Sequence, residues 1–475
     1  MIQGAIHRVH FIGIGGTGMC GLAEILLTLG YEVSGCDLAT ETAAVERLER
    51  LGARVAKGHA PEHVKDQDLI VVSSAVGSDA PEVRAARRRR IPVLKRGHML
   101  AEIMRLKYGV AVAGAHGKTT TTSLVGHLLS EVGRDPTVVV GGRVRSLASN
   151  ARLGAGDIFV AEADESDGSF LEILPTLAVV TNIDREHLDH YKNLDAILSA
   201  FRRFMRSVPF YGVVVLCGDD PHLRTMLPQI NRPVLTYGES PECRIRISDV
   251  QLEGTRSRFR LTVGERDLGS FAVPLAGRHN ILNATAAVAV GLFLGVSPEL
   301  LRSALAGFAG VGRRFEARGS AAGVLHLDDY GHHPTEVRAV LAAAREAYRE
   351  RRIVVLFQPH RYTRTAALHA EFGAAFGDAD LVVLTDIHPA GETPIAGVTG
   401  EVLRGPIETQ SRVRVVYAAR EEEVVRELPA LLQAGDLLVT LGAGPVWRWG
   451  DAVMAQVAAR ASACSQSSEA RVDRT

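Results

Sequence analysis

Residues 114–119, Gly-Ala-His-Gly-Lys-Thr, have the composition of a loop that wraps phosphate groups. The loop follows the apolar run 110–113 and precedes a helical pattern, so backbone N–H groups and the positive end of a helix dipole would face an anion. Its spacing is the short GxxGKS/T form, because Val112 stands where the longer P-loop has a glycine. We expect Lys118 to balance the phosphate charge and the Thr119 hydroxyl to contact Mg²⁺. The loop therefore predicts a nucleoside triphosphate site.

Candidate metal ligands follow two neighbouring strand patterns. The segment 161–167, Ala-Glu-Ala-Asp-Glu-Ser-Asp, comes directly after the apolar run 158–160. Packed carboxylates repel one another unless a cation neutralises them, which favours a metal here, with an exposed acidic loop as the alternative. His187 follows a further strand, which we expect beside the strand that carries the phosphate loop. That position makes His187 a second candidate ligand, although a single histidine is more often a surface or packing residue.

A second glycine-rich stretch lies near the amino terminus, at 13–18, Gly-Ile-Gly-Gly-Thr-Gly, between a strand pattern and a helical pattern. Glycines let the backbone approach a pyrophosphate, and Asp37 follows the next strand, where an acidic residue commonly binds a ribose hydroxyl. Ser73 and Ser74 end another strand of the same sheet and could donate to a phosphate or a base, or simply cap the strand. Taken alone, the stretch predicts a nicotinamide site, or a turn that only packs helix on strand.

Three blocks of alternating strands and helices must position these residues. The first block has strand patterns at 9–14, 31–36 and 68–73. The second has them at 110–113, 157–161, 177–181 and 213–216, and the third at 324–327, 353–357, 381–385 and 436–441. Such alternation predicts parallel sheets covered by helices, with ligands at the carboxyl ends of the strands. Polar–apolar alternation at 244–248 and 258–262 predicts antiparallel hairpins in addition.

The composition is that of an ordinary globular protein and excludes several classes. The chain has 475 residues, 46% of them hydrophobic, and Lys plus Arg balance Asp plus Glu at 54 each. This length favours about three domains, and the balanced charge argues against binding of nucleic acid. The longest apolar segment, 284–296, is too short to span a membrane, so we expect no membrane insertion. No signal peptide is expected, and five cysteines without a CxxC pair suit a cytoplasmic protein.

An ordered set of motifs along the chain resembles the Mur ligases. The two most specific are Asp-Asp-Tyr-Gly-His-His-Pro at 328–334 and Gln-Pro-His-Arg-Tyr-Thr-Arg at 358–364. The likeness extends from His7 to about Trp449. The other matching segments are 10–24, 114–121, 162–170, 181–191, 277–283 and 312–315.

The resemblance implies an α/β fold in three domains. A Rossmann-like N-terminal domain, 1–107, would bind a uridine diphosphate substrate. A P-loop ATPase-like central domain with a small antiparallel sheet, 108–312, would bind ATP, and a Rossmann-like C-terminal domain, 313–461, would bind the incoming amino acid. Residues 462–475 are polar and aperiodic, which predicts a disordered tail.

The implied activity is ATP-dependent ligation of L-alanine to the lactyl carboxylate of UDP-N-acetylmuramate. The reaction would pass through an acyl phosphate and form the first peptide bond of a peptidoglycan precursor, with ATP and Mg²⁺ as cofactors. Alternatives are a ligase that recycles a murein tripeptide or adds another amino acid, a nicotinamide-dependent oxidoreductase, and a nucleotide-dependent switch without ligase chemistry. An oxidoreductase activity would not explain the phosphate loop, the acidic segment or His187. We expect a monomer or a weak homodimer.

The same resemblance assigns roles position by position. The residues expected at ATP are Gly114, Ala115, His116, Gly117, Lys118, Thr119, Thr120, His279, Asn280 and Asp329. Those expected at the UDP-sugar are Gly15, Gly16, Thr17, Gly18, Asp37, Ser73 and Ser74. The expected metal ligands are Thr119, Glu162 and His187. Catalytic roles are expected for Lys118, Arg313, Arg314, His332 and His333.

Two positions depart from the family pattern. Ala115 stands where threonine is usual, but its backbone N–H remains, so we expect little loss. The segment 194–209 contains no lysine, so the carbamylated lysine of several sister ligases is not expected.

Overall fold

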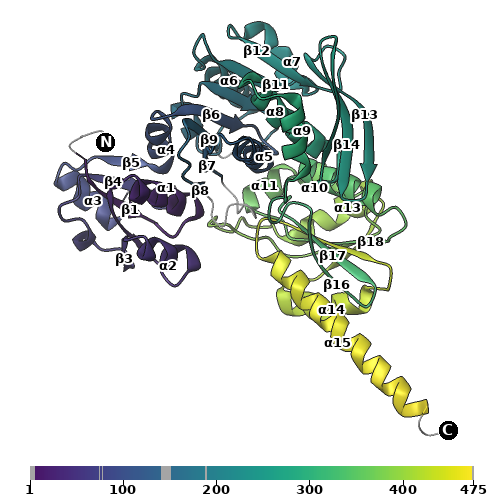
Figure 1. Ribbon diagram of the computed structural model, residues 1–475. Coiled ribbons are helices and arrows are strands. Elements are labelled where there is room, and N and C mark those ends of the chain that lie inside the picture. Colours follow the sequence, from purple (N-terminus) through teal and green to yellow (C-terminus); the bar gives the residue numbers. More distant parts are fainter. Residues whose placement is uncertain (1–5, 74, 78, 141–150, 188–189, 473–475) are drawn as a thin grey trace. The chain divides into compact units, whose positions relative to one another are not determined.

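The computed structural model of the chain describes residues 6–73, 75–77, 79–140, 151–187 and 190–472, without the side chains of Thr17 and of 463–472 (Figure 1). By their contacts the residues form two compact units. One comprises Met1–Asp249, Phe259–Val273 and Leu282–Val311, and the other Val250–Arg258, Pro274–Ile281 and Gly312–Thr475. Three sheets form the framework, of five, ten and six strands.

The N-terminal sheet is parallel throughout, in the order β3-β2-β1-β4-β5. Its strands are β1 (Arg8–Ile12), β2 (Glu32–Asp37), β3 (Arg54–Lys57), β4 (Leu69–Val72) and β5 (Val93–Lys95). Its helices are α1 (Thr17–Thr28), α2 (Ala43–Arg50), the 3-10 turn η1 (Pro61–His63), α3 (Pro81–Arg88) and α4 (Arg96–Met104). The strand order reverses between β1 and β4, and ligands of such sheets bind beyond the carboxyl ends of those two strands. The stretch 13–18 follows β1, and Ser73 follows β4.

The central sheet has the order β15-β14-β13-β12-β11-β10-β6-β9-β7-β8. Its strands are β6 (Tyr108–Ala113), β7 (Thr137–Val139), β8 (Ala151–Arg152), β9 (Ile158–Glu162), β10 (Leu177–Val180), β11 (Val213–Cys217), β12 (Val234–Gly238), β13 (Ile245–Glu253), β14 (Arg256–Val263) and β15 (Arg266–Val273). Its helices are α5 (Lys118–Glu131), η2 (Ser169–Glu172), α6 (Leu194–Arg206), α7 (Pro221–Met226), η3 (Leu227–Gln229), α8 (Arg278–Phe293) and α9 (Pro298–Ala306).

Strand β6 lies between β9 and β10 and pairs with both in parallel. The phosphate loop, the acidic segment and the Thr181 segment therefore leave three adjacent strands at the same edge. The expected hairpins are also present, because β13, β14 and β15 are joined by two-residue turns, which connect only antiparallel strands.

The C-terminal sheet has the order β16-β17-β21-β18-β19-β20, with only β16 antiparallel to its neighbour. Its strands are β16 (Glu316–Ala321), β17 (Val324–Asp329), β18 (Ile353–Phe357), β19 (Leu381–Leu384), β20 (Arg414–Tyr417) and β21 (Leu437–Leu441). Its helices are α10 (Pro334–Ala347), α11 (Tyr362–Ala367), α12 (His369–Gly373), η4 (Gly400–Leu403), α13 (Arg404–Gln410), α14 (Glu421–Leu431) and α15 (Val446–Val472).

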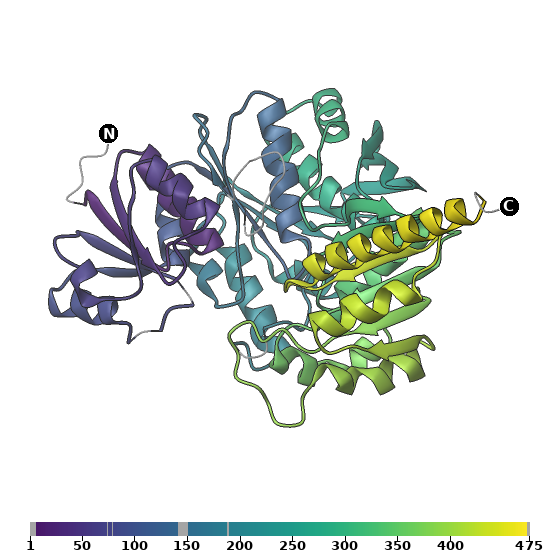
Figure 2. The ribbon, with the colours of Figure 1, turned by 90° about the horizontal axis from the view of Figure 1, so that it is seen from below.

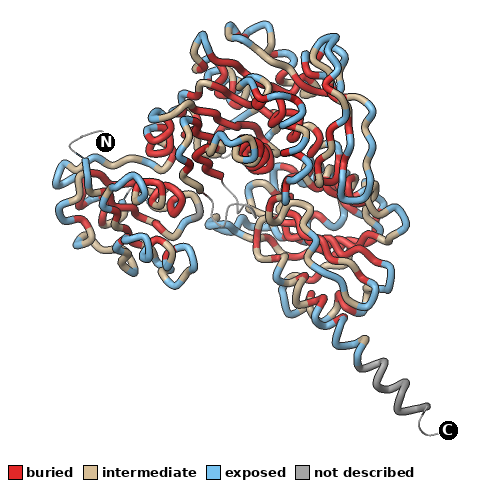
Figure 3. The backbone as a smooth tube through the Cα atoms, viewed as in Figure 1, coloured by how far each residue is buried: buried red, intermediate tan, exposed pale blue. Residues whose placement is uncertain are grey.

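Both faces of this sheet are covered, as the residues of β18 show. Ile353, Val355 and Phe357 pack into one core cluster with helices α10, α12 and α13, whereas Val354 and Leu356 pack into the other with α14 and α15. All five are buried, and Figure 3 shows burial concentrated along the strands. A strand that is apolar at every position is the pattern expected for a parallel sheet with helices on both sides.

The end of the chain differs from the expectation of a disordered tail at 462–475. Helix α15 continues past that point to Val472 (Figure 2). Val453, Met454 and Val457 attach its first half to the core. The segment 462–472 contains four serines beside its alanines and long polar residues, so its composition alone does not account for the helix.

Candidate active site

The phosphate loop lies between β6 and α5 and is held against the end of β10. The backbone N–H of His116 donates to Oδ1 of Asn182 at 2.8 Å, and the Thr181 hydroxyl donates to the carbonyl of His116 at 2.6 Å. Only glycine fits at position 114, because φ there is +139° and a Cβ would lie 2.0 Å from Oγ1 of Thr181. At Gly117 φ is +78°, and a Cβ would lie 2.4 Å from Oδ1 of Asn283. The loop is thus closely enclosed, with helix α5 beginning at its end.

Lys118, the first residue of α5, is folded over this loop. Its Nζ donates to the carbonyls of Gly114 and Ala115 at 2.6 and 3.0 Å and lies 2.9 Å from Oε1 of Glu165. Burial acts to lower the pKa of Lys118, but the surrounding carboxylates, Glu165 foremost, raise it above its ordinary value overall. Lys118 therefore stays a cation at the point where a phosphate group would enter.

Two of the three expected metal ligands are in contact. The Thr119 hydroxyl lies 2.9 and 3.1 Å from the two carboxylate oxygens of Glu162. Hydroxyl and carboxylate oxygens are hard ligands that suit Mg²⁺. Oε2 of Glu165 is buried close by and has no hydrogen-bond partner among the described residues, so the donor set is chemically suited to a hydrated divalent cation.

The third expected ligand, His187, faces the same carboxylate group from the other side. Its Nε2 lies 3.5 Å from Oε1 of Glu165 and 3.5 Å from Oε2 of Glu186. Burial acts to lower the pKa of His187, but the two carboxylates raise it overall. Only a neutral imidazole can bind a metal, so a proton and a metal would compete for His187.

Glu165 and Asn283 are site residues that sequence reasoning did not single out. Glu165 links Lys118 to His187, and Asn283 covers Gly117 while its Oδ1 accepts from the Thr121 hydroxyl at 3.2 Å. Each lies in a segment that was recognised, 161–167 and 277–283. Nothing in the sequence showed which acid of the first or which asparagine of the second would face the loop.

The amino-terminal glycine-rich stretch forms a tight turn that Asp37 stabilises. Oδ2 of Asp37 accepts from the N–H of Gly15 at 2.8 Å, and its Oδ1 accepts from the N–H of Ala39 at 3.1 Å. A Cβ on Gly13 would lie 3.0 Å from Cβ of Ser73, and a Cβ on Gly18 would lie 3.0 Å from Nη1 of Arg96.

The structure therefore brings Gly15, Asp37 and Ser73 to one turn. Gly16 lies within this turn, and its N–H donates to the carbonyl of Gly13 at 3.2 Å. Ser74 and the side chain of Thr17 lie outside the described residues. In this arrangement Asp37 shapes the turn, and the ribose contact that its spacing suggested stays a prediction.

Arg313 and Arg314 have different surroundings at the end of the C-terminal sheet. Nε of Arg313 lies 3.0 Å from Oδ2 of the buried Asp328, and its Nη2 donates to the carbonyl of Gly442 at 2.6 Å. Arg314 lies over the Tyr330 ring and 3.9 Å from Oε1 of Glu336. Arg313 thus ties β17 to the end of β21, which is a structural position.

Asp329 is buried at the end of β17. Its two oxygens accept from the N–H groups of Phe315 and Gly331 at 2.8 and 2.7 Å. Burial raises the pKa of Asp329 to about 6. Burial, with the nearby charge of Arg314, lowers the pKa of His279 to about 4, so His279 is neutral at pH 7. Asn280 donates through Nδ2 to the carbonyl of Ala276 at 2.8 Å.

The two adjacent histidines differ in the nitrogen that carries the proton. Nδ1 of His332 lies 2.9 Å from the carbonyl of Tyr330, which can only accept, so Nδ1 carries the proton and Nε2 the lone pair. Nδ1 of His333 instead accepts from the N–H of Thr335 at 3.3 Å and caps helix α10. A neutral His333 therefore carries its proton on Nε2. The two histidines therefore favour opposite tautomers.

Comparison with known proteins agrees with this geometry. Three family descriptions match in order: "Mur ligase family, catalytic domain" at 8–108, "Mur ligase middle domain" at 112–291 and "Mur ligase, glutamate ligase domain" at 313–444. The chain is 53% identical to a UDP-N-acetylmuramate–L-alanine ligase of Anaeromyxobacter dehalogenans, over 94% of this chain and 97% of that one. The chain belongs to the Mur ligase family. It is therefore an ATP-dependent ligase, and the predicted family and three-domain α/β fold are confirmed.

Further Mur ligases support the assignment along the whole chain. A UDP-N-acetylmuramate–L-alanine ligase of Geobacter sp. strain M21 is 49% identical over 96% of this chain and 99% of its own. The crystal structure of the UDP-N-acetylmuramate–alanine ligase of Thermotoga maritima superposes with a TM-score of 0.78 and 28% identity, covering 94% of this chain and 98% of that one. No helix in the described part of the chain is both long and apolar enough to cross a membrane.

Proposed function

We propose that this Mur ligase joins L-alanine to the lactyl carboxylate of UDP-N-acetylmuramate while ATP becomes ADP and phosphate. The names of relatives about 50% identical over nearly the whole chain support these substrates. The observation on the chain itself that carries the proposal is the group formed by Lys118, Thr119, Glu162 and Glu165 at the end of β6. It combines a fixed cation with oxygen ligands at a helix N-terminus, as phosphoryl transfer to an anion requires.

The bonds balance in two steps. A lactyl carboxylate oxygen attacks the γ-phosphorus, and the bond to ADP breaks, leaving an acyl phosphate. The alanine amine then attacks the acyl carbon, phosphate leaves with the bonding electrons, and the amine loses a proton to a base. Lys118, once an incoming phosphate group displaces Glu165, and the N–H groups at the start of α5 would stabilise the negative charge of the first step.

Mg²⁺, when bound, neutralises phosphate charge and polarises the γ-phosphoryl group. We assign Thr119, Glu162 and His187 to hold it. His187 binds the cation only as a neutral imidazole, and the carboxylates that raise its pKa favour the competing proton. The other loop residues at ATP, Gly114, Ala115, His116, Gly117 and Thr120, act through their backbone and position.

We assign the amino-terminal turn to the UDP group, because the N–H groups at the start of α1 suit a diphosphate. Within it, Gly15, Gly16, Thr17 and Gly18 supply the backbone, and Asp37 and Ser73 hold its shape; Ser74 belongs to the same proposal. In the C-terminal unit, His332 is the proposed proton acceptor through Nε2, Arg314 the proposed carboxylate contact, and His279, Asn280 and Asp329 the proposed nucleotide contacts.

Phosphate release from ATP and Mg²⁺ tests the proposal. Release should require both UDP-N-acetylmuramate and an amino acid, and should be greatest with L-alanine. Preference for a murein tripeptide would identify a recycling ligase, and release without any amino acid would identify a nucleotide switch. Oxidation or reduction of nicotinamide would indicate an oxidoreductase. We also propose a cytoplasmic location and a monomer or weak homodimer, which fractionation and analytical ultracentrifugation would test.

A further inference from the structure

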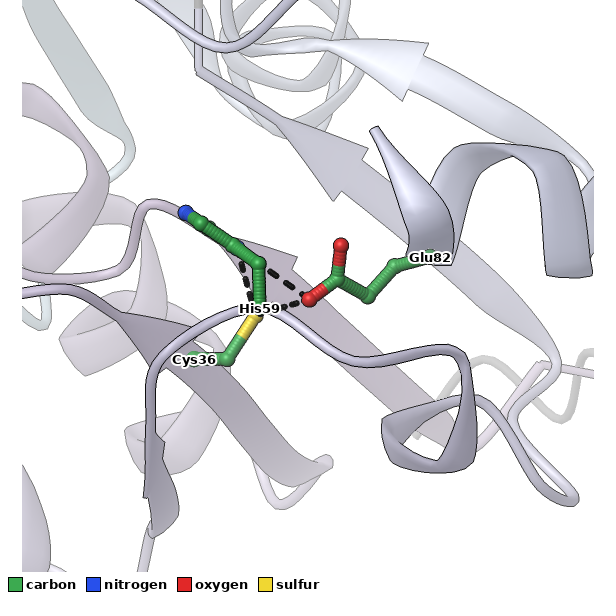
Figure 4. A group of neighbouring side chains, drawn as sticks. All are labelled: Cys36, His59 and Glu82. Carbon is green, nitrogen blue, oxygen red and sulfur yellow. Dashed lines mark hydrogen bonds and ion pairs between the residues drawn. The ribbon is translucent and has the colours of Figure 1, made fainter. Parts of the chain in front are cut away.

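A buried polar cluster lies in the N-terminal sheet and takes no part in the chemistry above. It joins Cys36, at the end of β2, His59, in the loop after β3, and Glu82, in the first turn of α3. Figure 4 shows the sulfur, Nδ1 and Oε1 of these side chains turned toward one another. Cys36 and Glu82 are fully buried, and His59 is 22% exposed at its side chain, so the cluster borders solvent on one side.

Hydrogen bonds alone do not account well for this cluster. Oε1 of Glu82 has four neighbours that can donate: Sγ of Cys36 at 3.3 Å, Nδ1 of His59 at 3.1 Å, the N–H of Ala60 at 2.8 Å and Nδ1 of His63 at 3.4 Å. A carboxylate oxygen has about two lone pairs to offer. Oε2 of Glu82, equally buried, has no hydrogen-bond partner among the described residues. The donors are thus crowded on one oxygen and missing at the other.

The spacing of the three atoms fits a tetrahedral metal. The separations are 3.6 Å from Sγ of Cys36 to Nδ1 of His59, 3.3 Å from Sγ to Oε1 of Glu82, and 3.1 Å from Nδ1 to Oε1. Around a tetrahedral zinc ion, the ordinary zinc–ligand distances give edges of about 3.5–3.6, 3.5–3.7 and 3.3–3.5 Å for the same pairs. The Sγ–Nδ1 edge matches this geometry, and the two edges to Oε1 are short by about 0.2–0.4 Å, which a small side-chain movement would correct.

We propose that Cys36, His59 and Glu82 bind a zinc ion, with a water molecule at its fourth position. Thiolate, imidazole and carboxylate together suit zinc, whereas Mg²⁺ prefers oxygen ligands alone. Nδ1 of His63 lies 3.4 Å from Oε1 of Glu82 but is not close to all three ligand atoms, so His63 borders the site without being one of its ligands. The proton of the Cys36 thiol passes to solvent when the metal binds, and affinity therefore rises with pH. Burial and the Glu82 carboxylate raise the pKa of this thiol in the metal-free protein, which strengthens that dependence.

A zinc ion bound here would connect β2, the loop after β3 and helix α3, next to the glycine-rich turn 13–18 that we assign to the UDP group. The carbonyl of Cys36 accepts from the N–H groups of Gly13 and Ile14 at 2.8 and 3.2 Å, and the next residue, Asp37, holds Gly15. The site would therefore stabilise the base of the turn without contacting substrate.

Cobalt titration of the full-length protein tests the site. The protein is stripped with a chelator and kept in excess Mg²⁺, and Co²⁺ is added while thiolate-to-cobalt charge-transfer absorption is recorded. The proposed magnesium ligands contain no sulfur, so they cannot produce that band. We expect a saturating band at about one equivalent, displaced by Zn²⁺, and a rise in the thermal midpoint when Zn²⁺ is bound.

Matched variants locate the ligands. The Cys36→Ser protein should lose the charge-transfer band. Cys243→Ser alters a buried cysteine between β12 and β13 and should keep the band. His59→Gln should weaken Co²⁺ binding by at least about 10-fold and serves as the second variant if Cys36→Ser fails to fold. Absence of the band in the unaltered protein, or its persistence in folded Cys36→Ser, would overturn the proposal.

Discussion

The ammonium group of Lys118 and the carboxylate of Glu165 form a buried ion pair at 2.9 Å, at the start of helix α5. An incoming phosphate group would have to share Lys118 with Glu165 or displace Glu165 from it. Glu165 therefore keeps the cation in place and charged between turnovers.

Lys118→Ala should reduce phosphate release by about 10²–10³-fold or more, because a fixed cation at the transferring group is lost. It should also lower the free energy of unfolding, by less than the roughly 3–5 kcal/mol of an unpaired buried charge, since the buried Glu165 loses Lys118 but keeps His187 at 3.5 Å. Adding Glu165→Gln should restore much of the stability but none of the activity. Steady-state assays and urea denaturation check both parts, with the exposed Lys65→Ala as control. An active Lys118→Ala enzyme would contradict the assigned role.

Gly117→Ala and Gly133→Ala form a matched pair, because the two glycines have φ of +78° and +77°. Both substitutions should cost about 1–2 kcal/mol of backbone strain. Only Gly117→Ala meets a neighbour, Oδ1 of Asn283 at 2.4 Å, whereas nothing lies within 4 Å at Gly133. We expect ATP affinity, measured by calorimetry, to fall by more than about 10-fold in Gly117→Ala alone, because the loop must shift to relieve the clash. Equal affinities in the two variants would show that the close approach is unimportant.

Arg313→Ala and Arg314→Ala separate a structural arginine from a functional one. Removing Arg313 leaves the buried Asp328 without its ion-pair partner, and should lower the free energy of unfolding by roughly 3–5 kcal/mol. Arg313→Lys should rescue little, because lysine cannot contact Asp328 and the carbonyl of Gly442 together. Arg314→Ala should instead raise the KM for substrate or lower kcat with a smaller change in stability. Urea denaturation and steady-state kinetics of both variants test the two roles. An Arg313→Ala protein as stable as the unaltered protein would refute the structural role of Arg313.

His326→Gln should weaken the loss of stability at acidic pH. Burial lowers the pKa of His326 to about 4 from an ordinary value of 6.5, so the unfolded chain takes up a proton that the folded chain refuses. Above pH 6.5 His326 is neutral in both states and its burial does not reduce the free energy of unfolding. As the pH falls from 6.5 toward 4, that free energy declines, because only the unfolded chain binds the proton. Between pH 7 and pH 5 the unaltered protein should lose about 2 kcal/mol more than His326→Gln.

Glutamine at this position can still bond to Oγ1 of Thr440, which lies 3.2 Å from Nε2 of His326. The exposed His369→Gln, as control, should leave the pH dependence of urea denaturation unchanged. If His326→Gln loses as much stability on acidification as the unaltered protein, burial of His326 is not the cause.

The site residues that are neighbours in the chain could be predicted from the sequence. Lys118 and Thr119 are adjacent in the chain, and a glycine-rich turn before a helix places them by short-range geometry alone. The same holds for the start of helix α10 at Pro334, whose cap comes from the residue before it. The motifs therefore predicted the family, the fold class and the phosphate loop.

Only the tertiary structure decided which distant residues complete these turns. Glu165 meets Lys118 because β9 lies next to β6, and Asn283 covers Gly117 from a helix far along the chain. Asp37 accepts from the N–H of Gly15, and Arg313 faces Asp328 where Arg314 does not. Spacing along the chain constrains neighbours within a turn or a helix. Contacts between strands depend on sheet order and side-chain direction, which emerge only when the whole core packs.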